Sequence, residues 1–285
     1  MREFIRNKKN IFSVIWILVV CVFYSTNVKA GQKSIVDLKD GITYTQYDVT
    51  GDKKADQIYI WGKKYDSAFY QEHRVYINGK CLIDIKDGDL GADAKILKFA
   101  DGTTYLYLVL WEDNGDGIHG IYQYKNGKMI KKAAPTDLLK NMGYHEFLNI
   151  EKIKGNTLFL TLGTYTNALG WLKFKVKYKC ENNNLKVYGK TYEVKQYARD
   201  SKNGSGVKSD RPYLTAARSL QAYKNESGSR KSFLIKKGTK LKALKVHIEK
   251  RKITFYLMTK SGKKGWCVSP KKYGNPFVLD AYYAG

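Results

Sequence analysis

The sequence predicts an all-β protein, in which an antiparallel β-meander is followed by a small barrel. Apolar and polar residues alternate with period two over long stretches, and residues 172–179 place four lysines opposite four apolar side chains. Two-residue hairpin signals then separate the strands. They are Asn78-Gly79, Asp101-Gly102, Asn126-Gly127 and Gly155-Asn156. The meander is expected to form a partial propeller or an irregular sandwich or barrel.

Residues 1–30 have the pattern of a secretory signal peptide. Basic residues precede an apolar run at 11–23, and Val28 and Ala30 stand at positions −3 and −1 of a cut before Gly31. The alternative is a retained anchor, but this run is shorter than the roughly twenty apolar residues that span a bilayer. We therefore expect a secreted, extracellular protein with no membrane span after signal cleavage.

The charge is distributed unevenly and indicates two domains. Residues 199–285 hold 21 basic and 5 acidic residues, a net charge of +16, whereas residues 31–198 hold 25 and 20. A polar stretch rich in Gly and Ser at 199–212 is typical of a linker. The sequence thus predicts a β domain at 31–198 and a second domain at 213–285, each large enough for its own core.

The loop at 48–56 is the candidate metal site. Its alternating ligands are Asp48, Thr50, Asp52, the backbone carbonyl of Lys54, and Asp56. Several oxygens that converge from one tight loop suit a hard cation such as Ca²⁺. An EF-hand is excluded, because its twelfth position needs a bidentate Glu and Tyr59 stands there.

This loop, followed by the strand-like residues 57–61, resembles the calcium loops of FG-GAP or integrin-type propeller repeats. Two weaker copies follow, one at Asp87, Asp89 and Asp93 and one at 112–117. Asp/Asn/Gly turns without metal are the alternative for all three. Residues 74–80 and 121–128 look like one hairpin used twice, but 168 residues are too few for seven blades of roughly 40–45 residues. A short helix is expected after Pro135.

The C-terminal part carries a second resemblance. Residues 217–224, 233–244 and 259–268 look, in that order, like a bacterial SH3 (SH3b) domain, so the predicted barrel is SH3-like. The resemblance implies binding of cell-wall peptide or glycan, with Tyr223, Tyr256 and Trp266 as candidate ligand-binding aromatics. Burial in the core is the alternative for Trp266.

The basic C-terminal part also predicts polyanion binding. A net charge of +16 can concentrate polyanions, which for an exported protein include teichoic acid. The lysines alternate along strands instead of forming a recognition helix, so sequence-specific nucleic-acid binding is not expected. The composition resembles that of Gram-positive (Firmicute) surface proteins, and we expect a monomer attached to peptidoglycan or teichoic acid.

The sequence lacks the usual motifs of an enzyme. No Gly-rich phosphate loop, His-Glu-x-x-His or Gly-x-Ser-x-Gly occurs. Cys267 has no histidine after it, which reverses the order of Cys-His peptidases. A secreted or cell-surface binding protein without catalytic activity is therefore expected, in which the SH3b-like domain associates with the cell wall and the β domain binds Ca²⁺ and an unknown partner or glycan. The alternative is an accessory module or degenerate form of a cell-wall or glycan hydrolase.

Overall fold

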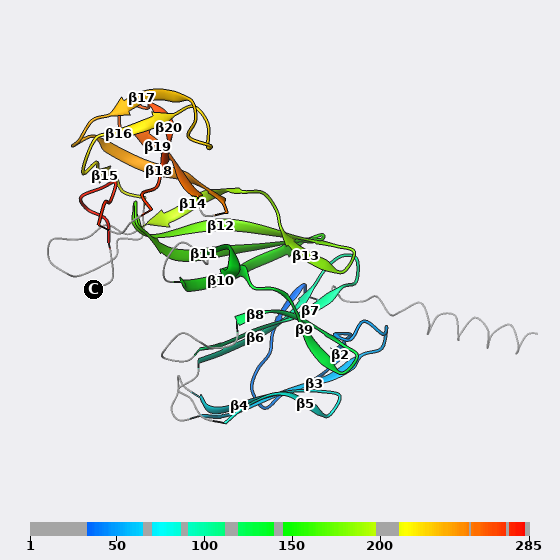
Figure 1. The fold of residues 1–285 in the computed structure, drawn as a ribbon. Coiled ribbons are helices and arrows are strands. Elements are labelled where there is room, and N and C mark those ends of the chain that lie inside the picture. Colours follow the sequence, from blue (N-terminus) through cyan, green and yellow to red (C-terminus); the bar gives the residue numbers. More distant parts are fainter. Residues whose placement is uncertain are drawn as a thin grey trace, which may run out of the picture. The chain divides into compact units, whose positions relative to one another are not determined.

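The computed structural model confirms the all-β class. It describes residues 33–64, 70–86, 91–111, 119–139, 145–197, 211–250, 252–271 and 274–282. These contain twenty β-strands and one 3-10 helix, and every strand pair is antiparallel (Figure 1). Residues Ser34–Gly285 form one compact unit. The predicted signal peptide at 1–30 and most of the predicted linker, residues 199–210, lie outside the described residues.

Two meanders open the compact unit. A 4-stranded sheet has the order β2-β3-β4-β5, and a 5-stranded sheet has the order β1-β6-β7-β8-β9. The strands of the first are β2 (Thr43–Tyr47), β3 (Asp56–Lys64), β4 (Tyr70–Ile77) and β5 (Lys80–Ile85). Those of the second are β1 (Ile35–Asp37), β6 (Gly91–Lys98), β7 (Thr104–Trp111), β8 (His119–Lys125) and β9 (Lys128–Ala133).

The four predicted hairpin turns are confirmed. Asn78 and Asn126 have φ angles of 51° and 52°, the left-handed conformation that a two-residue Asn-Gly turn requires. Each joins the last two strands of its sheet, β4–β5 and β8–β9, so the hairpin seen twice in the sequence holds the same place in both meanders. The turn at 101–102 connects β6 to β7. The turn at 155–156 connects β10 (His145–Lys154) to β11 (Thr157–Thr166).

An 11-stranded sheet contains the rest of the chain. Its path is β10-β11-β12-β14-β18-β19-β20-β16-β17, with β13 on β12 and β15 on β18. Its other strands are β12 (Gly170–Glu181), β13 (Asn184–Val187), β14 (Thr191–Tyr197), β15 (Leu214–Thr215), β16 (Leu220–Tyr223), β17 (Lys231–Ile235), β18 (Lys240–Glu249), β19 (Lys252–Thr259) and β20 (Lys264–Val268).

This sheet crosses the boundary that the charge distribution indicates. Residues Thr191, Tyr192 and Glu193 of β14 pair with His247, Val246 and Lys245 of β18. One edge of β18 is therefore used by β14 and β15 and the other by β19. The path stays open, and the part of the chain that the structure describes contains no closed barrel.

Side chains of β7 enter two cores. Tyr105, Tyr107 and Val109 belong to a cluster shared with β11, β12 and the C-terminal strands. Leu106 and Leu108, which point the other way along the same strand, belong to a cluster shared with β3 and β4. Burial on both faces explains why residues 105–109 are apolar without interruption, while β12 alternates between buried positions and positions that are half-buried or exposed.

The short helix predicted after Pro135 is present as the 3-10 helix η1 (Pro135–Leu139). Its last residue, Leu139, is fully buried in the larger of the two cores. Among the described residues, no helix is long and apolar enough to cross a membrane.

Candidate functional site

Three candidate ligand-binding aromatics form one row across the C-terminal strands. Trp266 of β20 pairs with Tyr256 of β19 on one side and with Tyr223 of β16 on the other. The row continues at both ends into a lysine, because Tyr256 pairs with Lys245 of β18 and Tyr223 with Lys231 of β17. Paired residues point to the same face of a sheet, so these side chains lie on one face. Tyr223 and Trp266 are neighbours there although they are 43 residues apart in the sequence.

The middle of this aromatic row is packed and its ends are more open. Trp266 is 9% exposed, and its ring lies 4.9 Å from that of Tyr256 and 6.2 Å, edge to face, from that of His247. Tyr223 and Tyr256 are half-buried, and Lys231 and Lys245 are exposed. Trp266 is therefore mostly buried, as the alternative of a core tryptophan predicts. The two tyrosines have the ring surface that a ligand could contact.

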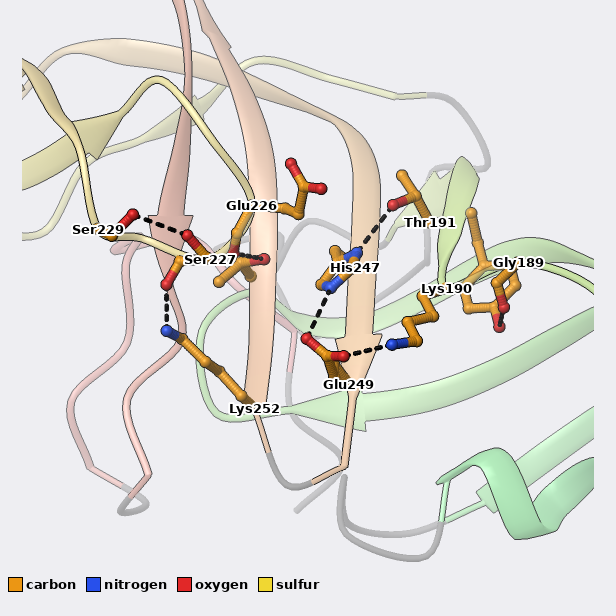
Figure 2. Close-up of polar contacts among 11 residues, drawn as sticks. Gly189, Lys190, Thr191, Glu226, Ser227, Ser229, His247, Glu249 and Lys252 are labelled. Atoms are coloured by element: carbon orange, nitrogen blue, oxygen red, sulfur yellow. Dashed lines mark hydrogen bonds and ion pairs between the residues drawn. The ribbon is translucent and has the colours of Figure 1, made fainter.

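A loop at 224–230 closes over the strands beside the row. The hydroxyl of Thr254 donates to the carbonyl of Glu226 at 3.0 Å, and the ammonium group of Lys252 donates to the carbonyl of Ser227 (Figure 2). The amide of Lys224 donates to the carbonyl of Arg230 at 2.8 Å and closes the loop at its base. These bonds connect the loop, which begins directly after Tyr223, to β19.

A polar chain that the sequence analysis missed lies next to Trp266. The imidazole Nδ1 of His247 is 2.8 Å from the hydroxyl of Thr191, and its Nε2 is 3.8 Å from the carboxylate of Glu249 (Figure 2). Lys190 in turn binds Glu249 and holds the pKa of that carboxyl below its ordinary value. The chain connects β14 with β18. No sequence signal could have found it, because residues 190–191 and 247–249 are close only through strand pairing.

In the candidate metal loop, the carboxylates of Asp48 and Asp56 accept hydrogen bonds from the protein itself. Asp56 is 2% exposed, and its carboxylate accepts from the amides of Val49 and Thr50 at 2.7 and 2.9 Å and from the side-chain amide of Asn78 at 2.8 Å. Asp48 accepts from the amides of Gly51 and Lys53 at 2.6 and 2.8 Å. The hydroxyl of Thr50 lies between them, 3.2 Å from Asp48 and 3.4 Å from Asp56.

Asp52, another predicted ligand, makes a separate contact. Asp52 is exposed and accepts from the amide of Lys54 at 2.8 Å. Nowhere in the described ranges do three or more His, Cys, Asp or Glu side chains gather as they would around a metal ion. The arrangement in the structure is thus a loop closed by Asp side chains. A carboxylate has about four lone-pair sites, so Asp48 and Asp56 keep acceptor capacity, and calcium binding stays a prediction.

The weaker candidate loops fall largely outside the described residues. Asp87, Asp89 and residues 112–117 are among the undescribed positions. Asp93 lies within β6 and not in a loop, where it pairs with Val109 and accepts from the ammonium group of Lys95 at 2.8 Å.

The cysteines of the described residues are free thiols in two environments. Cys81 is exposed, whereas Cys180 and Cys267 are buried. Burial raises the pKa of the Cys267 thiol to about 12 and also raises the pKa of Cys180. A nucleophilic cysteine needs the opposite shift.

Comparison with known proteins gives no relative for this chain. No family model, no curated protein and no solved structure matches it.

Proposed function

We propose that this protein is a secreted or cell-surface binding protein without catalytic activity, a monomer that associates with the cell wall. The aromatic row Tyr223–Trp266–Tyr256 carries the proposal, because three adjacent strands contribute one aromatic side chain each to the same face. In this view the row binds the glycan or peptide of peptidoglycan.

The chemistry of the row supports a ligand with both apolar and polar surfaces. An aromatic ring offers a flat apolar face, and a half-buried tyrosine keeps its hydroxyl available to water or to a ligand. Sugar rings match this, because their C–H faces stack on aromatic rings while their hydroxyls form hydrogen bonds. Lys231 and Lys245 at the two ends add donors for the carboxylates of a wall peptide.

The second candidate function, a degenerate form or accessory module of a wall hydrolase, has one observation in its favour. Thr191, His247 and Glu249 form a hydroxyl–imidazole–carboxylate chain, the order of groups that activates a hydroxyl nucleophile. However, Glu249 is bound to Lys190, and the chain joins the edges of β14 and β18. The chain is therefore better understood as a clamp between strands.

The experiment is a pull-down of the chain from Gly31 onward on purified wall sacculi, prepared with and without teichoic acid. We expect binding to sacculi stripped of teichoic acid and no release of soluble wall fragments. Release of such fragments that Thr191→Val abolishes would favour the hydrolase instead. Absence from both kinds of sacculi at low salt would overturn the proposal.

A further inference from the structure

We propose that the exposed face of β10, β11 and β12 binds a linear, phosphodiester-linked polyol, a polymer of the teichoic-acid type. This lysine face consists of Lys152, Lys154, Lys173, Lys175, Lys177 and Lys179. Only the choice of polymer depends on the proposed function, because teichoic acid is available to an exported protein. Its surface lies on other strands than the aromatic row, so each can fail without the other.

Strand register arranges these ammonium groups in lines. The four lysines of β12 occupy every second position, so their Cα atoms follow one another at about 6.6 Å along one face. Lys152 and Lys154 stand two strands away, opposite Phe159 and Thr157 of β11, which in turn pair with Lys177 and Lys179. A flexible polyanion lying along β12 therefore meets a cation at each step.

Two lysines flank one aromatic ring at the centre of the face. The ammonium groups of Lys152 and Lys177 lie 5.4 and 5.5 Å from the centre of the Phe159 ring, one reaching it from each neighbouring strand. Within the part of the chain that the structure describes, neither lysine has a carboxylate at ion-pair distance. Two uncompensated positive charges beside one ring leave a position where a single phosphate would interact with both.

The arrangement costs stability, which a ligand would offset. Lys179 stands directly opposite Lys186 of β13, and like charges at directly opposed positions destabilise a sheet. The nearby carboxylates only partly balance the face. Glu151 is 3.1 Å from Lys175, and Glu181 is 4.0 Å from Lys179.

The rings on this face favour a polymer without bases. Lys173 lies 5.0 Å from the centre of the Trp171 ring and Lys179 lies 4.1 Å from that of Tyr188, so an ammonium group already lies over one face of each ring, as at Phe159. Single-stranded nucleic acid binds such surfaces by stacking its bases on uncovered aromatic faces. A polyol phosphate needs only cations at regular spacing, and this face has them.

The test measures binding of poly(glycerol phosphate) to the chain from Gly31 onward, which keeps the whole compact unit Ser34–Gly285. The double variant K152Q/K177Q should weaken binding on the order of tenfold and lower the slope of log K against log salt by about 1.4, the value for two lost phosphate contacts. The control K236Q/K237Q removes the same charge from exposed positions between β17 and β18 and should change both quantities little.

Further arms separate the alternatives. Equal losses in the two double variants would overturn the proposal, because general attraction to a basic protein would then explain the binding. Tighter binding of a single-stranded oligonucleotide than of poly(glycerol phosphate) would overturn the choice of polymer. Replacement of Tyr223 and Tyr256 by alanine should leave the binding of poly(glycerol phosphate) unchanged. Conversely, K152Q/K177Q should not change binding to sacculi stripped of teichoic acid.

Discussion

Tyr256 and Trp266 face each other across β19 and β20 with their ring centres 4.9 Å apart and their planes inclined by 40°. This contact holds Trp266 from one side while His247 contacts it edge to face from another. Because Trp266 is enclosed in this way, its removal would damage the fold. The tyrosines at its two sides are the better probes of binding.

The first prediction concerns these tyrosines. Tyr256→Ala and Tyr223→Ala should each weaken binding to sacculi stripped of teichoic acid by about fivefold, since one stacking contact contributes roughly 1 kcal/mol. The measurement is a binding isotherm, with the melting temperature recorded to confirm folding. Tyr59→Ala is the matched control, because Tyr59 is also half-buried beside another tyrosine, Tyr76, but lies in the 4-stranded sheet. An equal loss in Tyr59→Ala would contradict the assignment.

The second prediction concerns calcium. If Ca²⁺ binds the loop at 48–56, it stabilises the folded state by about 2.7 kcal/mol at a hundredfold excess over its Kd. We expect a higher melting temperature in millimolar Ca²⁺ than in EDTA, and Asp52→Ala should remove the difference. Identical melting curves in the two conditions would refute the calcium prediction.

The third prediction separates the structural role of the same loop from any metal. Asp56→Ala should lower the free energy of unfolding by about 3 kcal/mol in EDTA, because the amides of Val49 and Thr50 and the side chain of Asn78 lose a buried, charged acceptor. Asp52→Ala should change it by no more than about 0.5 kcal/mol, because Asp52 is exposed. Denaturant unfolding measures both. Equal effects would show that Asp56 does not close the loop.

The fourth prediction concerns the turn between β11 and β12. Gly170 has a φ angle of +67°, and a Cβ there would lie 2.2 Å from the carbonyl oxygen of Tyr282. Gly170→Ala should therefore cost about 3 kcal/mol, from backbone strain together with the displaced C-terminal segment. Gly189 has a φ angle of +85° and open space around it, so Gly189→Ala should cost only about 1 kcal/mol. A similar decrease in the free energy of unfolding for both variants would show that the contact with Tyr282 does not contribute to the cost.

The fifth prediction concerns pH. Burial lowers the pKa of His73 below its ordinary value of 6.5, against the opposing effect of Asp40, so the folded chain binds a proton at this imidazole less readily than the unfolded chain does. As the pH falls below about 6.5, the unfolded chain binds a proton that the folded chain does not, and stability decreases. The decrease continues down to the folded-state pKa.

His73→Phe is the test of that assignment. It keeps a ring at 5.4 Å from Tyr70 without a titrating group. Its melting temperature should fall less steeply between roughly pH 7 and pH 5 than that of the natural chain. Parallel curves for the two proteins would assign the acid sensitivity to other groups.

The features that the sequence predicts correctly are local ones. Asn78-Gly79 and Asn126-Gly127 specify their turns through the two residues themselves, and the alternation at 172–179 specifies which side of β12 is buried. For the candidate aromatics, the sequence indicates the residue types of Tyr223, Tyr256 and Trp266 but not that they are neighbours. Their adjacency follows from strand order, which no local pattern contains.

The features that sequence reasoning missed depend on distant pairing or on hydrogen bonds. The spacing at 48–56 indicates oxygen ligands, yet the same spacing lets Asp48 and Asp56 accept backbone amides, and the pattern alone does not distinguish the two. The charge difference between residues 31–198 and 199–285 reflects surface composition. It holds no information on whether strands pair across the boundary, as β14 and β18 do.

The pairing of β14 with β18 also determines how this chain can be divided or recombined. A gene fusion that transplants residues 211–285 alone would leave β14 behind and expose the β18 edge at Lys245, Val246 and His247. Unpaired edge strands of this kind join to other chains and aggregate. A transferable cassette would therefore have to begin before Thr191 and, because β14 also pairs with β12, before Gly170. In evolutionary terms, the C-terminal strands can be exchanged between proteins only together with the sheet that supports them.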